Sequence, residues 1–212
     1  MTEDEVLHAY AARAAEYESL LGSVEDMGEL DRRRIERWAG GLEGPGLTGP
    51  VLDAGCGPGH WTHFLQGLGL DVSGVDLVPE FIRSARVRFP NVPFRVASLR
   101  ALDLPDGHHA GVLAWYSLIH FAPTELPPAI MELRRVLQPK GRLLVGFFEG
   151  DSGEPFDHAV TTAYYWSVDE MSAMLQDAGF EVLDVESRQV PGRRPHAAIA
   201  AVAAVARSEK TS

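Results

Sequence analysis

From Val51 onward, short apolar runs alternate with longer segments in which apolar residues recur at helical spacing. The runs predict strands and the longer segments predict helices. The predicted strands begin at Val51 and then span 72–75, 93–96, 111–116 and 142–148, and the helices between them span 61–68, 79–89 and 125–137. This alternation is typical of a parallel sheet with right-handed crossovers.

The pattern changes after Phe148. Residues 149–160 carry glycines, acids and a proline without a clear period and are predicted to form a loop. Ser167 and Glu170 have the spacing of a capping box, which predicts a helix over 168–178 that ends at Gly179. Two last strands, 180–189 and 197–206, are separated by a Pro-Gly-Arg-Arg-Pro turn, so the final strand is expected to be antiparallel.

Before Val51, residues 3–38 contain two helical stretches. In the first, Val6, Tyr10, Ala14 and Tyr17 recur at helical spacing. The glycine- and proline-rich residues 40–50 are then a linker to the first strand. We expect one domain over 1–212, with an N-terminal helical cap over 1–45 and a substrate lid loop over 149–166.

Composition and charge exclude several classes of protein. No apolar run approaches membrane-spanning length and the acidic N-terminus lacks a signal-peptide pattern, so a cytoplasmic protein without membrane contact is expected. A net charge of −11 argues against a nucleic-acid partner. Cys56 is the single cysteine, which excludes a disulfide framework, and we expect it to be a small buried filler rather than a nucleophile.

The segment 51–59 is the strongest local motif. A strand runs into Asp53 and then into glycines at 55, 57 and 59 before a helix start, where a backbone without Cβ atoms can approach a ligand. A dinucleotide fingerprint would need glycine at His60. Asp76 ends the second strand, the place where such folds put a carboxylate that accepts ribose hydroxyls.

Together with 102–107 and 134–141, these features resemble the class I S-adenosylmethionine-dependent methyltransferases of small molecules, a methyltransferase type 11/25-like group. The resemblance covers about 51–183. It implies an α/β fold: a Rossmann-like, doubly wound, seven-stranded, mostly parallel sheet with a C-terminal antiparallel hairpin strand and helices on both faces. It also implies S-adenosyl-L-methionine as cofactor.

The resemblance assigns the cofactor contacts residue by residue. The backbone of Ala54, Gly55 and Gly57 would face the amino-acid half of the cofactor, and Asp53 would act on its ammonium group or brace the loop. Asp76 would accept the ribose hydroxyls, and Trp115 would contact the sulfonium. The adenine contacts are Leu77, Ser98 and Leu99, and the family usually has an acid at position 98 and another at Ala110. Tyr10 and Tyr17 would cap the pocket, or their helix would simply pack on the sheet.

Acceptor and catalytic residues are expected around the end of the fourth strand. Tyr116 ends this strand and Ser117 and His120 come after it, and His120, with His158 as second choice, could act as a general base on a hydroxyl acceptor. A structural histidine is the alternative for both. The aromatic residues Tyr164, Tyr165 and Trp166 would wall the acceptor pocket or belong to the core, and Arg193 would receive an acidic group. No metal site is expected.

The sequence thus predicts methyl transfer by in-line displacement to a small organic acceptor, in a monomer or homodimer. Two alternatives remain at this point. One is a non-catalytic or regulatory protein that binds S-adenosylmethionine, favoured by Ser98 and Ala110. The other is a nicotinamide-dependent oxidoreductase, which the glycine spacing disfavours.

Overall fold

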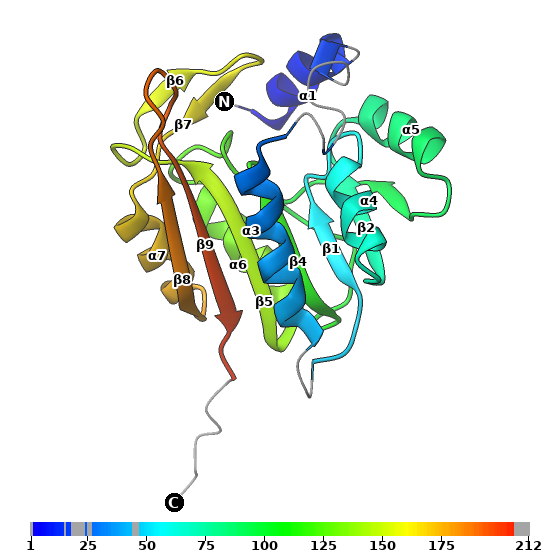
Figure 1. Cartoon of the computed structure of the whole chain (residues 1–212). Coiled ribbons are helices and arrows are strands. Elements are labelled where there is room, and N and C mark those ends of the chain that lie inside the picture. The colour runs from blue at the N-terminus through cyan, green and yellow to red at the C-terminus, as the bar shows by residue number, and fades with distance from the viewer. Residues whose placement is uncertain (1, 15, 18–23, 25–26, 44–46, 206–212) are drawn as a thin grey trace, which may run out of the picture.

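A seven-stranded sheet forms the centre of the computed structural model, which describes residues 2–14, 16–17, 24, 27–43 and 47–205 (Figure 1). Its strand order is β3-β2-β1-β4-β5-β9-β8. The strands are β1 Val51–Ala54, β2 Val72–Asp76, β3 Phe94–Val96, β4 His109–Trp115, β5 Leu137–Phe148, β8 Phe180–Arg188 and β9 His196–Ala203. Strands β1 to β5 pair in parallel, and β9 is antiparallel to both β5 and β8. The predicted fold class is confirmed.

Helices cover both faces of this sheet, as predicted. They are α1 Glu3–Ala12, α3 Glu29–Gly40, α4 His60–Gly67, α5 Pro79–Arg88, α6 Leu126–Val136 and α7 Val168–Asp177, and a short 3₁₀ helix, η1, spans Gly41–Glu43. Pro79 is in the first turn of α5, where its missing N–H costs nothing. The Ser167 hydroxyl accepts from the N–H of Glu170 and caps α7 as expected.

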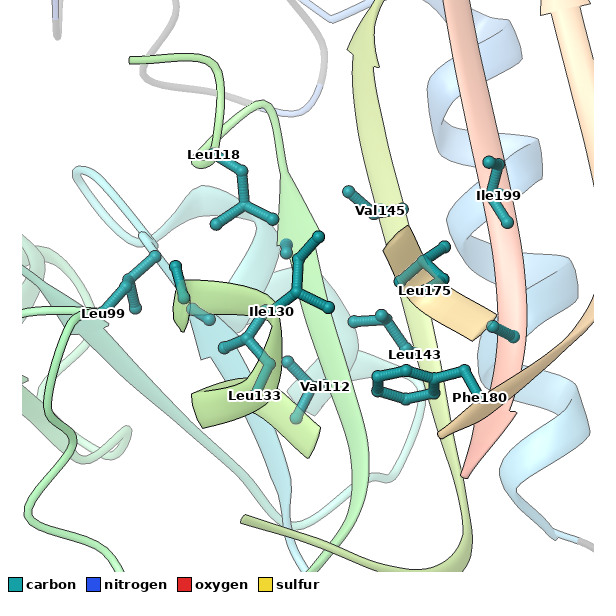
Figure 2. Packing of buried hydrophobic residues seen from close by; sticks show 14 of the residues in the cluster. Leu99, Val112, Leu118, Ile130, Leu133, Leu143, Val145, Leu175, Phe180 and Ile199 are labelled. Atoms are coloured by element: carbon teal, nitrogen blue, oxygen red, sulfur yellow. The ribbon is translucent and has the colours of Figure 1, made fainter. Parts of the chain in front are cut away.

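Neighbouring residues of each central strand contribute to different faces, because side chains alternate along a strand. Val112 lies in the cluster beneath α6 and α7, whereas Leu113 packs with residues of α3 and α4. Figure 2 shows Ile130 and Leu133 of α6 close to Val112 in the first cluster. The central strands are therefore buried on both sides, which explains their continuous apolar sequence.

Two differences from the sequence prediction are larger than a few residues at the end of an element. Strand β5 starts at Leu137 rather than Arg142, because Leu137 pairs with His109 before a shift in register, and Lys140 takes a positive φ inside the bulge. The expected loop after Phe148 contains β6 Pro155–Asp157, which pairs with β7 Thr162–Tyr164 in an antiparallel ribbon. Three-residue strands are too short for a period to be recognised in the sequence.

The N-terminal part contains the two expected helical stretches, α1 and α3. Residues 1, 15, 18–23, 25–26 and 44–46, which belong to the predicted cap or linker, lie outside the described residues. Helix α1 lies near α5, beyond the carboxyl ends of the parallel strands, and the β6–β7 ribbon lies beyond the same ends (Figure 1). This is the side of the sheet at which the parallel strands end. The strand order reverses between β1 and β4, and open α/β sheets bind ligands beyond the strand ends at such a reversal.

Candidate active site

The loop after β1 takes a shape that requires its glycines. Gly55, Gly57 and Gly59 all have positive φ, at 81°, 53° and 84°. A Cβ at Gly55 would lie 2.2 Å from the Cβ of Ser117, which follows β4. The backbone of the loop therefore packs directly against the segment that follows β4.

Asp76 fixes the opposite wall of the site. Its Oδ2 accepts from the N–H of Gly57 at 2.8 Å and its Oδ1 from the N–H of Val78 at 2.9 Å. Burial raises the pKa of this carboxyl to about 6, against the opposing effect of these backbone donors. Each carboxylate oxygen has a second lone pair, so Asp76 can accept two more hydrogen bonds from a ligand.

Asp53 lies below the loop and is 2% exposed. Its Oδ2 accepts from the Thr62 hydroxyl of α4 at 2.6 Å. Burial raises the pKa of Asp53 to about 7, with a smaller opposing contribution from Thr62. The donor is a side chain of α4 rather than an N–H group of the glycine loop, so both predicted roles of Asp53, bracing the N–H groups of the loop and contacting a ligand ammonium, stay predictions.

These elements enclose a cavity of about 140 Å³ at the carboxyl ends of the parallel strands. Eleven of the predicted site residues line it. They are Tyr10, Tyr17, Gly55, Gly57, Asp76, Leu77, Leu99, Trp115, Tyr116, Ser117 and His120. The sequence prediction thus named residues from five segments of the chain that meet around one space.

The segment after β4 places two unusual groups on the cavity. Tyr116 has a φ of +55°, rare for a non-glycine residue. The Ser117 hydroxyl is buried and has no hydrogen-bond partner among the described residues. A buried hydroxyl without a partner costs free energy, so this oxygen is suited to a polar group of a ligand.

His120 has a defined hydrogen-bonding state. Its Nδ1 lies 2.7 Å from the carbonyl oxygen of Thr162, which can only accept, so Nδ1 carries the proton. Burial lowers the pKa of His120, and the neutral ring leaves the Nε2 lone pair free to accept from the Tyr10 hydroxyl at 2.7 Å. The neutral state is the one that a general base requires.

His158 lies behind His120, with 5.5 Å between the ring centroids. Burial, followed by the charges of His120 and Arg194, lowers the pKa of His158 to about 4. His158 does not line the cavity, and its Nδ1 has no partner among the described residues. Of the two histidines predicted as bases, His120 is therefore the one in reach of a ligand in this cavity.

Helix α1 closes the cavity through contacts that were only partly expected. Tyr10 packs edge-on against Tyr17 and against Phe81 of α5, and Tyr17 packs on Phe81 with tilted rings. Glu3 also lies 3.6 Å from Arg100, and both line the cavity. Glu3 and Arg100 were not predicted, because an ion pair between residues so far apart in the chain leaves no local pattern.

The remaining predicted residues lie elsewhere. Ala54 is buried in the core, and the Ser98 hydroxyl accepts from the N–H of Arg100 in a tight turn instead of facing the cavity. Trp166 is 2% exposed within the core, the second of its two predicted roles, and Tyr164 packs partly against the same cluster. Tyr165 and Arg193 line a second cavity.

Two further observations concern the described residues only. None of their helices has the length and apolar content needed to cross a membrane. Among them no group of three or more His, Cys, Asp or Glu side chains is arranged to hold a metal ion. Cys56 is buried behind the glycine loop, where burial raises the pKa of its thiol, in agreement with a packing role.

Comparison with known proteins adds to this geometry. Residues 51–141 match the family model described as a methyltransferase domain. An O-methyltransferase, cnsE, of Penicillium expansum is 29% identical over 77% of this chain and 63% of its own length. A malonyl-[acyl-carrier protein] O-methyltransferase of Serratia marcescens is 32% identical over 63% of this chain and 51% of its own length. The chain thus spans between half and two thirds of these relatives.

A solved structure extends the likeness to nearly the whole chain. The 1,6-didemethyltoxoflavin-N1-methyltransferase of Burkholderia thailandensis, solved with its substrate and S-adenosylhomocysteine, superimposes with a TM-score of 0.70 at 22% identity, over 97% of this chain and 92% of the other. This likeness concerns the fold. The matched family model identifies residues 51–141 as a methyltransferase domain, in agreement with the expected resemblance to the class I S-adenosylmethionine-dependent methyltransferases.

Proposed function

We propose that this protein transfers a methyl group from S-adenosylmethionine to a small organic acceptor. The observation that carries the proposal is the cavity at the reversal of strand order, where the glycine loop, Asp76 and the end of β4 meet. The two curated relatives described above are methyltransferases by name, and the solved relative holds the demethylated cofactor.

The residues around the cavity fit this cofactor. Gly55 and Gly57 offer a surface without side chains, and the lone pairs left on Asp76 suit two ribose hydroxyls. The unpartnered hydroxyl of Ser117 adds a polar group within the same space. Leu77 and Leu99 supply apolar contacts for an adenine ring. Asp53, Ala54 and Ser98 do not line the cavity, so their assigned contacts are the weaker part of the proposal.

When bound, the cofactor supplies a methyl group that is already activated by a sulfonium cation. The protein then has to align the two reactants and exclude water. Trp115 lines the cavity and offers an aromatic face, which attracts a cation. Tyr10, Tyr17 and Phe81 cover the cavity with rings in contact, and these rings keep water from the reacting atoms.

For an acceptor that must lose a proton, His120 is the proposed base. Its neutral Nε2 now accepts from the Tyr10 hydroxyl. An acceptor hydroxyl that takes the place of the Tyr10 hydroxyl would meet the same lone pair and pass its proton to it. The Thr162 carbonyl, bonded to Nδ1–H, then stabilises the cationic ring that results.

Turnover with S-adenosylmethionine carrying a deuterated methyl group tests the proposal. The protein is incubated with a panel of phenols, carboxylic acids, amines and thiols, and products are detected by mass spectrometry. We expect labelled product from at least one acceptor, and a rate about 10²-fold lower in His120→Gln if the acceptor is a hydroxyl. Binding of S-adenosylhomocysteine without turnover on any acceptor would favour the non-catalytic alternative instead.

A further inference from the structure

A second cavity lies at the turn between β8 and β9. It is lined by Phe148, Tyr165, Gly192, Arg193, Arg194, Pro195 and His196. Four segments meet there: the end of β5, the residue after β7, the β8–β9 turn and the start of β9. The turn and the β6–β7 ribbon lie near each other, on the same side of the sheet as α1, beyond the carboxyl ends of the parallel strands (Figure 1).

Two guanidinium groups give this cavity positive charge. Arg193 and Arg194 have no carboxylate within ion-pair distance among the described residues, although the whole chain has a net charge of −11. Arg194 is held in place, since it donates to the Asp157 carbonyl at 2.9 Å and lies 4.7 Å from the ring centroid of Phe156. The side chain of Arg193 has no hydrogen bond among the described residues and is available to a ligand.

Aromatic rings form part of the wall of this cavity, which Phe148, Tyr165 and His196 line. Tyr165 packs on Phe156 with 4.2 Å between the ring centroids, and Phe148 lies 5.2 Å from Phe156 and 5.0 Å from His196. A Cβ at Gly150 would lie 2.9 Å from the Tyr165 ring, so that ring is held against the backbone. Flat rings beside a guanidinium suit a flat, anionic ligand.

One hydrogen bond joins a residue that lines this cavity to a residue that lines the cavity assigned to the cofactor. The Tyr116 hydroxyl lies 2.7 Å from Nδ1 of His196. Tyr116 lines the first cavity and His196 lines the second. Tyr116 and His196 therefore link the two cavities directly, and a ligand beside His196 lies one hydrogen bond away from a residue that lines the first cavity.

We propose that the second cavity binds the anionic end of a planar, aromatic methyl acceptor, with Arg193 as the residue that pairs with its carboxylate. This inference rests on the proposed function, because it treats the occupant as the acceptor. It adds the chemical class of that acceptor: an aromatic acid whose charged end lies at the β8–β9 turn and whose other end points toward Tyr116.

Titration calorimetry with two matched probes tests this site. The probes are 2-naphthoate and 2-naphthamide, which share the ring system and differ in charge. The protein is saturated with S-adenosylhomocysteine, so that the first cavity is filled, and the variants are Arg193→Gln, Arg194→Gln and the control Arg83→Gln. Arg83 is an exposed arginine on α5, far along the chain from the second cavity.

We expect wild type to bind naphthoate about tenfold more tightly than naphthamide, and Arg193→Gln to lose this preference. Arg194→Gln should weaken both probes, because its guanidinium also packs on Phe156. Arg83→Gln should behave as wild type. Equal affinity for the two probes, no binding of naphthoate, or a preference that survives in Arg193→Gln would overturn the inference.

The binding of S-adenosylhomocysteine is measured separately and decides the proposed function. If S-adenosylhomocysteine binds and naphthoate does not, the second site is wrong while the cofactor assignment stands. If naphthoate shows its Arg193-dependent preference and S-adenosylhomocysteine fails to bind, the anion site stands and the proposed function is wrong. Circular dichroism of each variant confirms that it is folded.

Discussion

The Tyr10 hydroxyl and Nε2 of His120 are 2.7 Å apart, which joins the N-terminal helix to the segment after β4. The other ring nitrogen of His120 bonds to the carbonyl of Thr162 in β7. One imidazole therefore connects two elements that flank the cavity, α1 and the β6–β7 ribbon. Any ligand that uses Nε2 of His120 has to displace the Tyr10 hydroxyl, and with it one of the contacts that hold α1 closed.

Removal of this hydroxyl should loosen α1. A net hydrogen bond is worth about 1 kcal/mol, so Tyr10→Phe should speed amide hydrogen exchange in α1 by about fivefold. Tyr17→Phe is the matched control, because it removes a hydroxyl from the same ring cluster and Tyr17 has no side-chain hydrogen bond among the described residues. Equal exchange in wild type and Tyr10→Phe would mean that the hydrogen bond does not hold the helix.

Ser117 gives a prediction in which stability and binding change in opposite directions. Its buried hydroxyl has no partner among the described residues, so Ser117→Ala should stabilise the free protein by about 1 kcal/mol. The same change should weaken binding of S-adenosylhomocysteine several-fold, because the hydroxyl is then missing from the site. Thermal unfolding and titration calorimetry measure the two effects, and a loss of stability in the free protein would contradict the assignment.

Gly55 should tolerate no side chain. Gly55→Ala combines strain at φ 81° with a Cβ placed 2.2 Å from Ser117. Gly69→Ala is the control, since Gly69 has a φ of 90° with nothing within 4 Å of the added Cβ. The control should lose about 1 kcal/mol from strain alone, whereas Gly55→Ala should lose more and bind S-adenosylhomocysteine at least tenfold less tightly. Identical melting temperatures for the two variants would show that the close contact has no cost.

Asp53 makes the stability depend on pH. Its pKa is raised by burial to about 7 in the folded protein, above the value of about 3.9 in an unfolded chain, so the folded state binds the extra proton. The stabilisation is present below pH 4 and is lost as the pH rises through 7. Asp53→Asn mimics the protonated form, so relative to wild type it should gain up to about 4 kcal/mol at pH 8 and little at pH 4.

Denaturant unfolding at the two pH values checks this prediction. The difference between the variant and wild type isolates Asp53 from groups of opposite sign, such as His158, whose pKa is lowered by burial to about 4. Asp71→Asn is the control, because Asp71 lies at the exposed start of β2. If the difference in unfolding free energy between Asp53→Asn and wild type is the same at both pH values, the raised pKa of Asp53 is contradicted.

The fold was predictable from the sequence because its signals are local. Apolar runs of four to seven residues mark the central strands, and Gly55, Gly57 and Asp76 mark the ends of β1 and β2. The boundaries that failed depend on pairing at a distance: Leu137 extends β5 by facing His109, and Phe156 enters a ribbon only because Ala163 pairs with it. Neither pairing leaves a period in the sequence.

The candidate site was predictable where it follows strand ends, and less so where it depends on side-chain contacts. Trp115, Tyr116 and Ser117 were identified from their place after β4, and all three line the cavity. Ser98 was expected to face the ligand, but its hydroxyl caps a local turn, and the sequence does not show that competition. Arg100 could not be found in this way because its ion-pair partners, Glu3 and Glu125, lie far away in the chain.

The central claim is that the cavity beside Asp76 binds the cofactor. Calorimetric titration with S-adenosylhomocysteine tests it directly, on wild type, Asp76→Ala and the control Asp71→Ala, which removes a carboxylate from the other end of β2. We predict micromolar or tighter binding by wild type and Asp71→Ala, and binding at least about 10²-fold weaker by folded Asp76→Ala, which loses charged hydrogen bonds to the ligand. Undiminished binding by Asp76→Ala, or none by wild type, would contradict the assignment of this cavity.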